Sequence, residues 1–303
     1  MFIKKHVVII GNGEPILNKL VANLLEQNCC VDIVLYAPPT SIIKDTLKRV
    51  NYFNVHEADV LANAEVVINT TFMVSPNNIK KIKKNLKFYR NIIKNINKNA
   101  KLIDITPLIK DNLVKSFYKE IKKCESYSRE HFDNYISLAT PVIFSPTDSL
   151  IQDIEELYNI SNKIFNYKEN FSYVDRDDLV DAILAIMENN NYAGTNFEIG
   201  NYSSTNIDYV NDSVIIDSKQ LHEISSISWL GICLLSFIYK KKLNGFSRKY
   251  LYFIKAAKKT SKNALNLENL NIKKHSLLCM LAKYKDNNLK NQNNEDFEEY
   301  EIY

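Results

Sequence analysis

Tyr118 and Lys122 form the residue pair in this sequence that is best suited to chemistry. Their Y-x-x-x-K spacing puts both side chains on one face of a helix. A lysine ammonium beside a tyrosine favours the phenolate, so the phenol can relay a proton to or from a carbonyl group. Thr106 follows the strand-like segment Leu102-Ile103-Asp104-Ile105 and can supply an orienting hydroxyl. Together these residues suit carbonyl reduction or oxidation.

A second interpretation of Tyr118 and Lys122 stays open. The chain has 18 tyrosines and many lysines, so this spacing also arises without function. In that case Tyr118 packs against the protein and Lys122 is solvated on a helix surface.

A possible phosphate-binding turn follows the apolar run 7–10. A dinucleotide-binding turn uses three glycines, for the bend, for the pyrophosphate and for helix packing. Gly11 can serve the bend, Asn12 follows it, and Gly13 comes one position early for the second role. Glu14 and Leu17 occupy the other two glycine positions. Because a carboxylate repels a pyrophosphate, we expect a degenerate site.

The end of the second predicted strand shows another defect. A carboxylate there binds the ribose 2′-hydroxyl of NAD, and an arginine accommodates a 2′-phosphate. Here the strand ends in Tyr36, an alanine and two prolines, and Asp32 comes too early. With Thr70 at the end of a further predicted strand, the candidate cofactor residues are Gly11, Asn12, Gly13, Tyr36 and Thr70. We expect either no cofactor or weakly bound NADP(H).

Strands and helices alternate along the first half of the chain. Apolar, β-branched runs predict strands at 7–10, 31–36, 64–70, 101–105 and 135–143, and helices are predicted at 17–25, 77–98, 112–132, 150–165 and 179–188. This alternation is typical of a parallel sheet covered on both faces. We therefore predict an α/β, Rossmann-like, doubly wound fold with a smaller, mainly helical C-terminal lobe.

Composition limits the classes of function. The net charge is +4, and the lysine-rich stretch 80–84 lacks aromatic stacking partners, so we expect no nucleic-acid partner. Five cysteines without a C-x-x-C pair, and five histidines without a helical H-x-x-x-H pair, favour neither disulfides nor a metal site. We predict no metal ligand.

Several segments resemble extended and atypical short-chain dehydrogenases/reductases. Their Y-x-x-x-K motif matches the segment that begins at Tyr118, their R-P pair matches Thr140-Pro141, and their G-P-x-D motif matches residues 144–148. Two positions differ: Thr140 replaces the arginine and Ser145 replaces the glycine. Residues 173–183 resemble their V-x-D-V-A-x-A-I segment, and residues 194–200 resemble a following strand. The resemblance implies the catalytic roles given above for Thr106, Tyr118 and Lys122.

The C-terminal third is similar to one branch of that superfamily. Residues 243–251, 264–272 and 281–285 resemble, in order, three motifs of the Rossmann-type accessory subunit of respiratory complex I, the alpha subcomplex subunit nine family. Asn271 replaces a glycine of that pattern. The resemblance implies a non-catalytic accessory or assembly subunit of the NADH:quinone oxidoreductase, partnered by other complex I subunits. The alternative is an NADP-dependent reductase or epimerase acting on a small carbonyl or sugar-nucleotide substrate.

The domain boundaries follow from these patterns. We assign residues 1–148 to the Rossmann-like domain with 168–190 packing back on it, residues 149–167 and 191–286 to the lobe, and residues 287–303 to a disordered tail. Residues 224–239 are too short an apolar run to span a membrane. Together with Lys240 to Lys242 they suit peripheral membrane contact. With no signal peptide evident, the resemblance implies the cytoplasmic side of a bacterial inner membrane or the mitochondrial matrix side.

Overall fold

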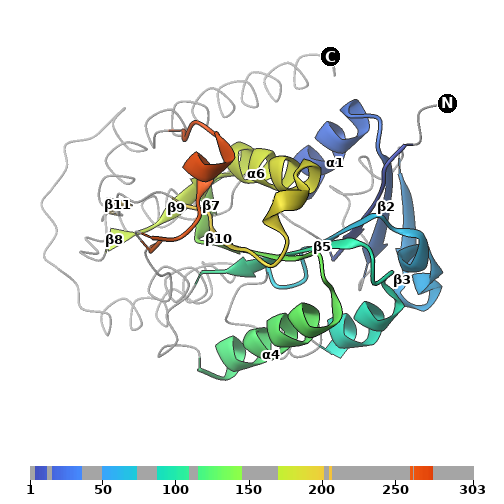
Figure 1. Ribbon diagram of the computed structural model, residues 1–303. Helices are drawn as coiled ribbons and strands as arrows, with labels where there is room; N and C mark the ends of the chain where they lie inside the picture. The colour runs from blue at the N-terminus through green and yellow to red at the C-terminus, as the bar shows by residue number, and fades with distance from the viewer. Residues whose placement is uncertain are drawn as a thin grey trace, which may run out of the picture.

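The fold is built around a seven-stranded parallel sheet (Figure 1). The computed structural model describes residues 4–11, 16–35, 50–73, 87–108, 115–144, 170–200, 205–206, 260–261 and 263–275. The sheet order is β3-β2-β1-β4-β5-β6-β10, and every neighbouring pair is parallel. The strands are β1 (His6–Ile10), β2 (Cys30–Leu35), β3 (Asn51–Asn54), β4 (Val66–Asn69), β5 (Lys101–Pro107), β6 (Tyr135–Thr140) and β10 (Asn196–Glu198). This confirms the predicted Rossmann-like α/β sheet.

Helices cover both faces of the sheet, so the molecule has three layers (Figure 1). The helix α1 (Leu17–Glu26) and the helix α6 (Arg176–Glu188) lie on one face. The helix α4 (Lys115–His131) lies on the other, which also packs against the helical residues 87–92. The described chain also contains four short 3-10 helices: η2 (Val55–Asn63), η3 (Ile93–Asn95), η4 (Asn190–Tyr192) and η5 (Leu267–Leu270).

Strand β1 shows why the central strands are apolar along their whole length. Val7, Val8, Ile9 and Ile10 are all fully buried. Because successive side chains of a strand point to opposite faces, Val7 and Ile9 pack in the cluster under α1 and α6, whereas Val8 and Ile10 pack under α4. A strand covered on both faces needs such a continuous apolar run.

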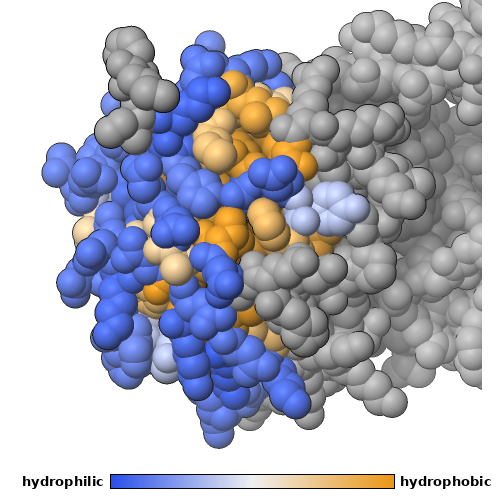
Figure 2. Space-filling view, turned by 90° about the vertical axis from the view of Figure 1, so that its right-hand side faces the viewer, coloured by the Kyte–Doolittle hydropathy of each residue, from blue (hydrophilic) through white to orange (hydrophobic). Residues whose placement is uncertain are grey.

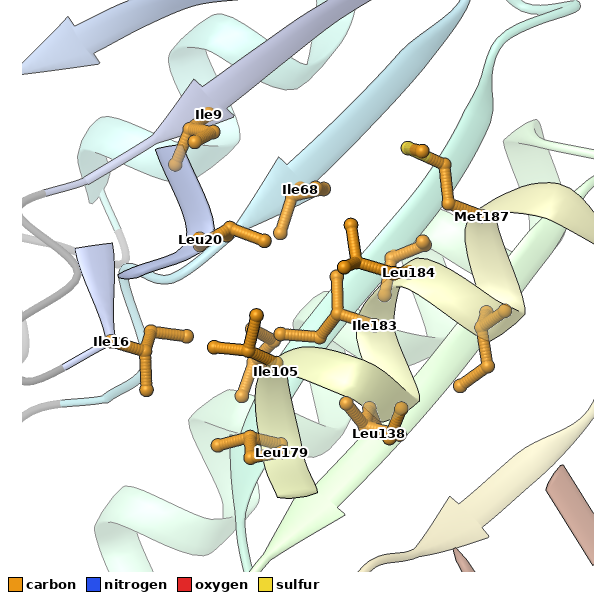
Figure 3. Packing of buried hydrophobic residues seen from close by; sticks show 14 of the residues in the cluster. Ile9, Ile16, Leu20, Ile68, Ile105, Leu138, Leu179, Ile183, Leu184 and Met187 are labelled. Carbon is orange, nitrogen blue, oxygen red and sulfur yellow. The ribbon is translucent and has the colours of Figure 1, made fainter. Parts of the chain in front are cut away.

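The cluster beneath α1 and α6 consists of aliphatic side chains from the sheet and both helices (Figure 3). Leu20 of α1 and Ile183 of α6 point toward Ile9, Ile68 and Ile105 of the strands. Burying side chains of this size stabilises a fold by about 1.5–3 kcal/mol each. This packing holds α1 and α6 on the same face of the sheet.

Polar groups define both ends of α6. At its start, the Asp175 carboxylate accepts a hydrogen bond of 2.7 Å from the Asp177 N–H, as an N-cap residue does. At its end, the buried Lys101 ammonium donates to the carbonyls of Ile186, Met187 and Asn189 at 3.1, 2.8 and 3.2 Å. Burial lowers the pKa of Lys101 to about 8. Strand β5 thus carries the group that satisfies the last carbonyls of α6.

Three details of the sheet differ from the sequence-based expectation. Strand β3 was not predicted, because it is short and lies at the sheet edge, where the Tyr52 side chain is 53% exposed and no apolar run marks the strand. The predicted strand 135–143 is interrupted at Pro141, which has no N–H to donate to a sheet. Beyond it, β7 (Val142–Phe144) pairs instead with β9 (Tyr173–Asp175).

The sheet also extends into the range that we assigned to the lobe. Strand β10 pairs in parallel with β6, and Phe197 forms a bridge with Leu265. Leu267 and Leu270 of η5 join the cluster under α6. A small antiparallel pair, β8 (Asn170–Phe171) with β11 (Thr205–Asn206), completes the described strands.

The exposed sheet edge is mainly hydrophilic. Figure 2 looks at the side of the molecule that carries β2 and β3, where hydrophilic side chains surround a smaller apolar area. Across the part of the chain that the structure describes, no helix has both the length and the apolar character needed to cross a membrane. The predicted helix 150–165, the segment 224–242 and the tail 287–303 lie outside the described residues.

Candidate functional site

The strand order places a topological switch point at the carboxyl ends of β1 and β4, where folds of this class have their ligand-binding crevice. These strands are neighbours in the sheet, but chain order runs outward from them in opposite directions. In doubly wound folds ligands bind at such a switch point. Gly11, which follows β1, and Thr70, which follows β4, meet at this position.

Gly11 is required there by its backbone and by its neighbours. Its φ is +100°, a conformation that residues with a Cβ rarely adopt. A Cβ on Gly11 would lie 2.9 Å from Thr70 Oγ1 and 3.0 Å from the Thr71 nitrogen. The Thr70 hydroxyl donates to the Ile10 carbonyl at 2.9 Å, and the Thr70 N–H donates to the same oxygen at 2.8 Å. Gly11 therefore lets the ends of β1 and β4 pack tightly together.

The start of α1 faces the same region of the fold. Its N-cap residue is Ile16, which makes no side-chain capping hydrogen bond, and its first turn carries no acidic residue. The unsatisfied N–H groups of a helix start favour an anion. The candidate residues Asn12, Gly13 and Tyr36, together with Glu14, lie outside the described residues.

The three candidate catalytic residues belong to β5 and α4. Along β5, Ile103 and Ile105 pack under α6, so Asp104 and Thr106 point to the face that α4 covers. Thr106 is buried at the strand end. On α4, the half-buried Tyr118 packs against the cluster on this same face.

Lys122 lies next to Tyr118, one helical turn later. Its Nζ is 5.4 Å from the centre of the Tyr118 ring, so the two side chains share a face of α4. The Lys122 ammonium also forms an ion pair with Glu125. Glu125 in turn accepts a hydrogen bond of 3.4 Å from Ser137 of β6. The negative charge of Glu125 opposes part of the field that Lys122 exerts on the phenol.

A buried polar cluster lies under α4, and our sequence analysis missed it. Asp104 is fully buried and accepts hydrogen bonds from Asn69 Nδ2 at 2.8 Å and from the Tyr89 hydroxyl at 2.8 and 3.0 Å. Ser128 of α4 lies 2.9 Å from the Tyr89 hydroxyl and 3.4 Å from Asp104 Oδ2. The signal was present, since Asp104 is a carboxylate inside an otherwise apolar strand.

The cluster has unusual acid–base properties. Burial raises the pKa of Asp104 to about 7, although hydrogen bonds from Asn69 and Tyr89 act in the opposite direction. Burial also raises the pKa of Tyr89, and the Asp104 charge adds to that effect. The Thr71 hydroxyl and N–H donate to Asn69 Oδ1 at 2.6 and 3.0 Å. Hydrogen bonds thus connect the cluster to Thr71, whose nitrogen lies beside Gly11 at the crevice.

Comparisons with known proteins support the fold assignment. No protein-family model and no curated protein sequence matches the chain. Among solved structures, a nucleoside-diphosphate-sugar epimerase from Staphylococcus aureus superposes with a TM-score of 0.63 at 15% identity, over 90% of this chain and 99% of the other. The UDP-glucose 4-epimerase of Thermotoga maritima, solved with UDP-glucose, gives 0.60 at 16% identity, over 94% and 99%.

A reductase shows the same similarity. The yeast methylglyoxal/isovaleraldehyde reductase, solved with NADPH, superposes with a TM-score of 0.54 at 11% identity, over 94% of this chain and 98% of the reductase. At such identities the similarity establishes the fold alone. This chain therefore has the Rossmann-like fold of these two epimerases and this reductase.

Proposed function

We propose that this protein binds an adenine dinucleotide across the crevice between β1 and β4 and reduces or epimerises a small carbonyl or sugar-nucleotide substrate. One observation carries the proposal. Thr106 ends β5 on the face covered by α4, and α4 carries Tyr118 and Lys122 side by side on that same face. A dinucleotide bound at the switch point of this strand order would lie beside the end of β5, which supports the proposal.

The described residues fit such a cofactor at the start of α1. Gly11 ends β1 with a positive φ, and the helix that follows begins without a side-chain cap. The N–H groups of this helix start would hold the pyrophosphate. When bound, the nicotinamide ring exchanges a hydride with the substrate.

In this proposal each catalytic side chain has a separate role. Tyr118 donates a proton to the carbonyl oxygen, or accepts one from the alcohol in the reverse direction. Lys122 stabilises the phenolate by its positive charge, and Thr106 orients the substrate oxygen with its hydroxyl. General acid–base catalysis by a positioned side chain contributes roughly 10²- to 10⁴-fold in rate.

A pair of variants on one helix tests this proposal. Tyr118→Phe should lower kcat by about 100-fold or more for carbonyl reduction or UDP-sugar epimerisation, with NADPH affinity unchanged. Tyr127→Phe is the matched control, because Tyr127 lies on α4 but stacks on His131 with ring centres 3.9 Å apart. Equal turnover in both variants would contradict the catalytic role of Tyr118. Failure of the wild-type protein to bind NAD(H) or NADP(H) would contradict the cofactor proposal itself.

A non-catalytic accessory subunit of the respiratory NADH:quinone oxidoreductase is the second candidate. The ion pair between Lys122 and Glu125 favours it, because a neutralised ammonium gives less support to a phenolate. The segment 264–272, which resembles the accessory-subunit pattern, contains η5 packed on the core. Its partners would be other subunits of that complex, with peripheral membrane contact through residues 224–242.

Co-purification distinguishes the two candidates. The accessory role predicts that the tagged full-length chain, isolated from gently solubilised native membranes, brings respiratory subunits with it. It also predicts that Tyr118→Phe leaves this association and the respiratory activity unchanged. A chain recovered without respiratory subunits, and active on a carbonyl substrate, would contradict the accessory role.

A further inference from the structure

Three potential metal ligands meet at the amino-terminal ends of β1 and β2, at the opposite edge of the sheet from the crevice. His6 begins β1 and pairs in register with Cys30, which begins β2. Cys30 and Asp32 are two positions apart on one strand, so both side chains point to the same face. The ligand atoms of His6, Cys30 and Asp32 all lie within 4.8 Å of one another.

The contacts of His6 leave one ring nitrogen directed at Asp32. His6 Nδ1 lies 3.1 Å from the Asn63 carbonyl oxygen, which can only accept a hydrogen bond. Either ring nitrogen can carry the hydrogen of the neutral ring, and the other then presents a lone pair. Nε2 lies 2.7 Å from Asp32 Oδ2, so the imidazole and the carboxylate already face each other in direct contact.

The surroundings match the way proteins orient metal ligands. A ligating histidine usually donates its other N–H to a carbonyl or carboxylate, and the Asn63 carbonyl lies at hydrogen-bond distance from His6 Nδ1. Ligating carboxylates are hydrogen-bonded in turn, and Asp32 Oδ1 accepts a bond of 3.1 Å from Asn51 Nδ2. Glu65 adds another carboxylate nearby, because its Oε1 accepts a hydrogen bond of 3.2 Å from the backbone N–H of His6.

We propose that His6, Cys30 and Asp32 form a zinc site that joins β1 to β2. Imidazole nitrogen, thiolate sulfur and carboxylate oxygen are all zinc ligands, with bonds of about 2.0–2.3 Å. Tetrahedral geometry with these bonds separates ligand atoms by about 3.3–3.8 Å, so small side-chain rotations suffice. Cys30 is exposed, which leaves its thiol free to rotate and the fourth position open to water. The site is independent of the proposed catalytic function.

Metal titration of the full-length protein tests the proposal. After treatment with a chelator, the wild-type protein should bind Zn²⁺ at one site when it competes with a chromophoric chelator, and its Tm should rise. Co²⁺ in place of Zn²⁺ should give a thiolate-to-cobalt charge-transfer absorption. Cys30→Ser should abolish that absorption, and His6→Gln or Asp32→Asn should weaken binding more than about tenfold, at least as much as removing an outer-shell partner does.

Cys29→Ser is the matched control for the thiol. Cys29 is adjacent in sequence but is buried outside the group of three ligands, so its variant should keep the cobalt absorption. Because Cys30 is exposed at the start of its strand, Cys30→Ser should fold normally, which keeps the test decisive. If wild-type protein binds no Zn²⁺, or if Cys30→Ser binds it equally well, the proposal is overturned. His6 and Asp32 then form a hydrogen-bonded pair without a metal ion.

Discussion

The two faces of the sheet bury side chains of different character. Under α1 and α6 the core cluster is hydrophobic throughout, as Ile9, Ile105 and Ile183 illustrate (Figure 3). Under α4 the sheet also buries Asp104 and its hydrogen-bond partners. The single strand β5 contributes to both faces, because its side chains alternate. The face under α4 therefore combines packing with a hydrogen-bonded carboxyl cluster, whereas the one buried ammonium described on the other face, that of Lys101, contacts the carbonyls at the end of α6.

The largest expected effect comes from removing the buried carboxylate. Asp104→Ala leaves donors on Asn69, Tyr89 and Ser128 without their partner in a dry interior. We expect the free energy of unfolding to fall by about 4 kcal/mol, as for other disrupted buried polar networks. Urea unfolding at pH 6 measures it. Asp104→Asn, which keeps an acceptor for these donors, is the control and should lose much less.

Shortening an aliphatic side chain under α1 and α6 should lower the free energy of unfolding slightly less, and through lost packing alone. Ile183→Ala should lower the free energy of unfolding by about 3 kcal/mol through lost burial and a residual cavity. No titratable group takes part, so the loss should be the same at pH 5 and pH 8. A loss that changes strongly with pH would contradict the contrast between the two faces.

Stability should also depend on pH through Asp104. Its pKa of about 7 in the folded protein is above the unfolded value, so the folded state holds the proton more tightly. The resulting stabilisation is fully present below the unfolded pKa and is lost as pH rises through 7. Between pH 5 and pH 8 the free energy of unfolding should fall by about 2–3 kcal/mol from this group. The same measurement on Asp104→Asn should show this part of the slope removed.

The smallest expected loss of stability concerns Tyr89, a hydrogen-bond partner of Asp104. Tyr89→Phe removes a hydroxyl that donates to Asp104, and we expect a loss of about 1–2 kcal/mol at pH 8. Because that hydrogen bond lowers the pKa of Asp104, the variant should also shift the carboxyl titration to higher pH. NMR titration of the carboxyl carbon can follow the shift. An unchanged midpoint would show that Tyr89 does not interact with the ionised carboxylate.

The sequence predicted the parts of the fold that depend on local pattern. Continuous apolar runs such as 7–10 identified the buried strands, and the positions of α1, α4 and α6 followed from the intervening helical patterns. Strand β3 was missed because Asn51 and Tyr52 are exposed at the sheet edge, so no apolar run marks it. The Pro141 interruption was visible in the sequence, but the pairing of β7 with β9 depends on tertiary contacts.

The sites were harder to predict because their residues meet through the sheet. Tyr118 and Lys122 are close in sequence, so helical spacing alone brings them together. His6 and Asp32, in contrast, are 26 positions apart and meet only through the parallel register of β1 and β2. Motif searches that rely on short spacing cannot find such a group. Whether Asn12, Gly13, Tyr36 and Thr70 contact a dinucleotide stays a prediction.

The Lys101 contact with the end of α6 has a consequence for the order of assembly. Lys101 precedes the Met187 carbonyl by 86 positions, so during synthesis β5 leaves the ribosome well before α6. Until α6 has been synthesised, water can hydrate the Lys101 ammonium at the start of β5. Docking of the helix then exchanges that water for three carbonyls at once. In a nascent chain that stops before residue 186, the Lys101 ammonium would therefore stay hydrated. In the folded protein the same group is buried against the end of α6.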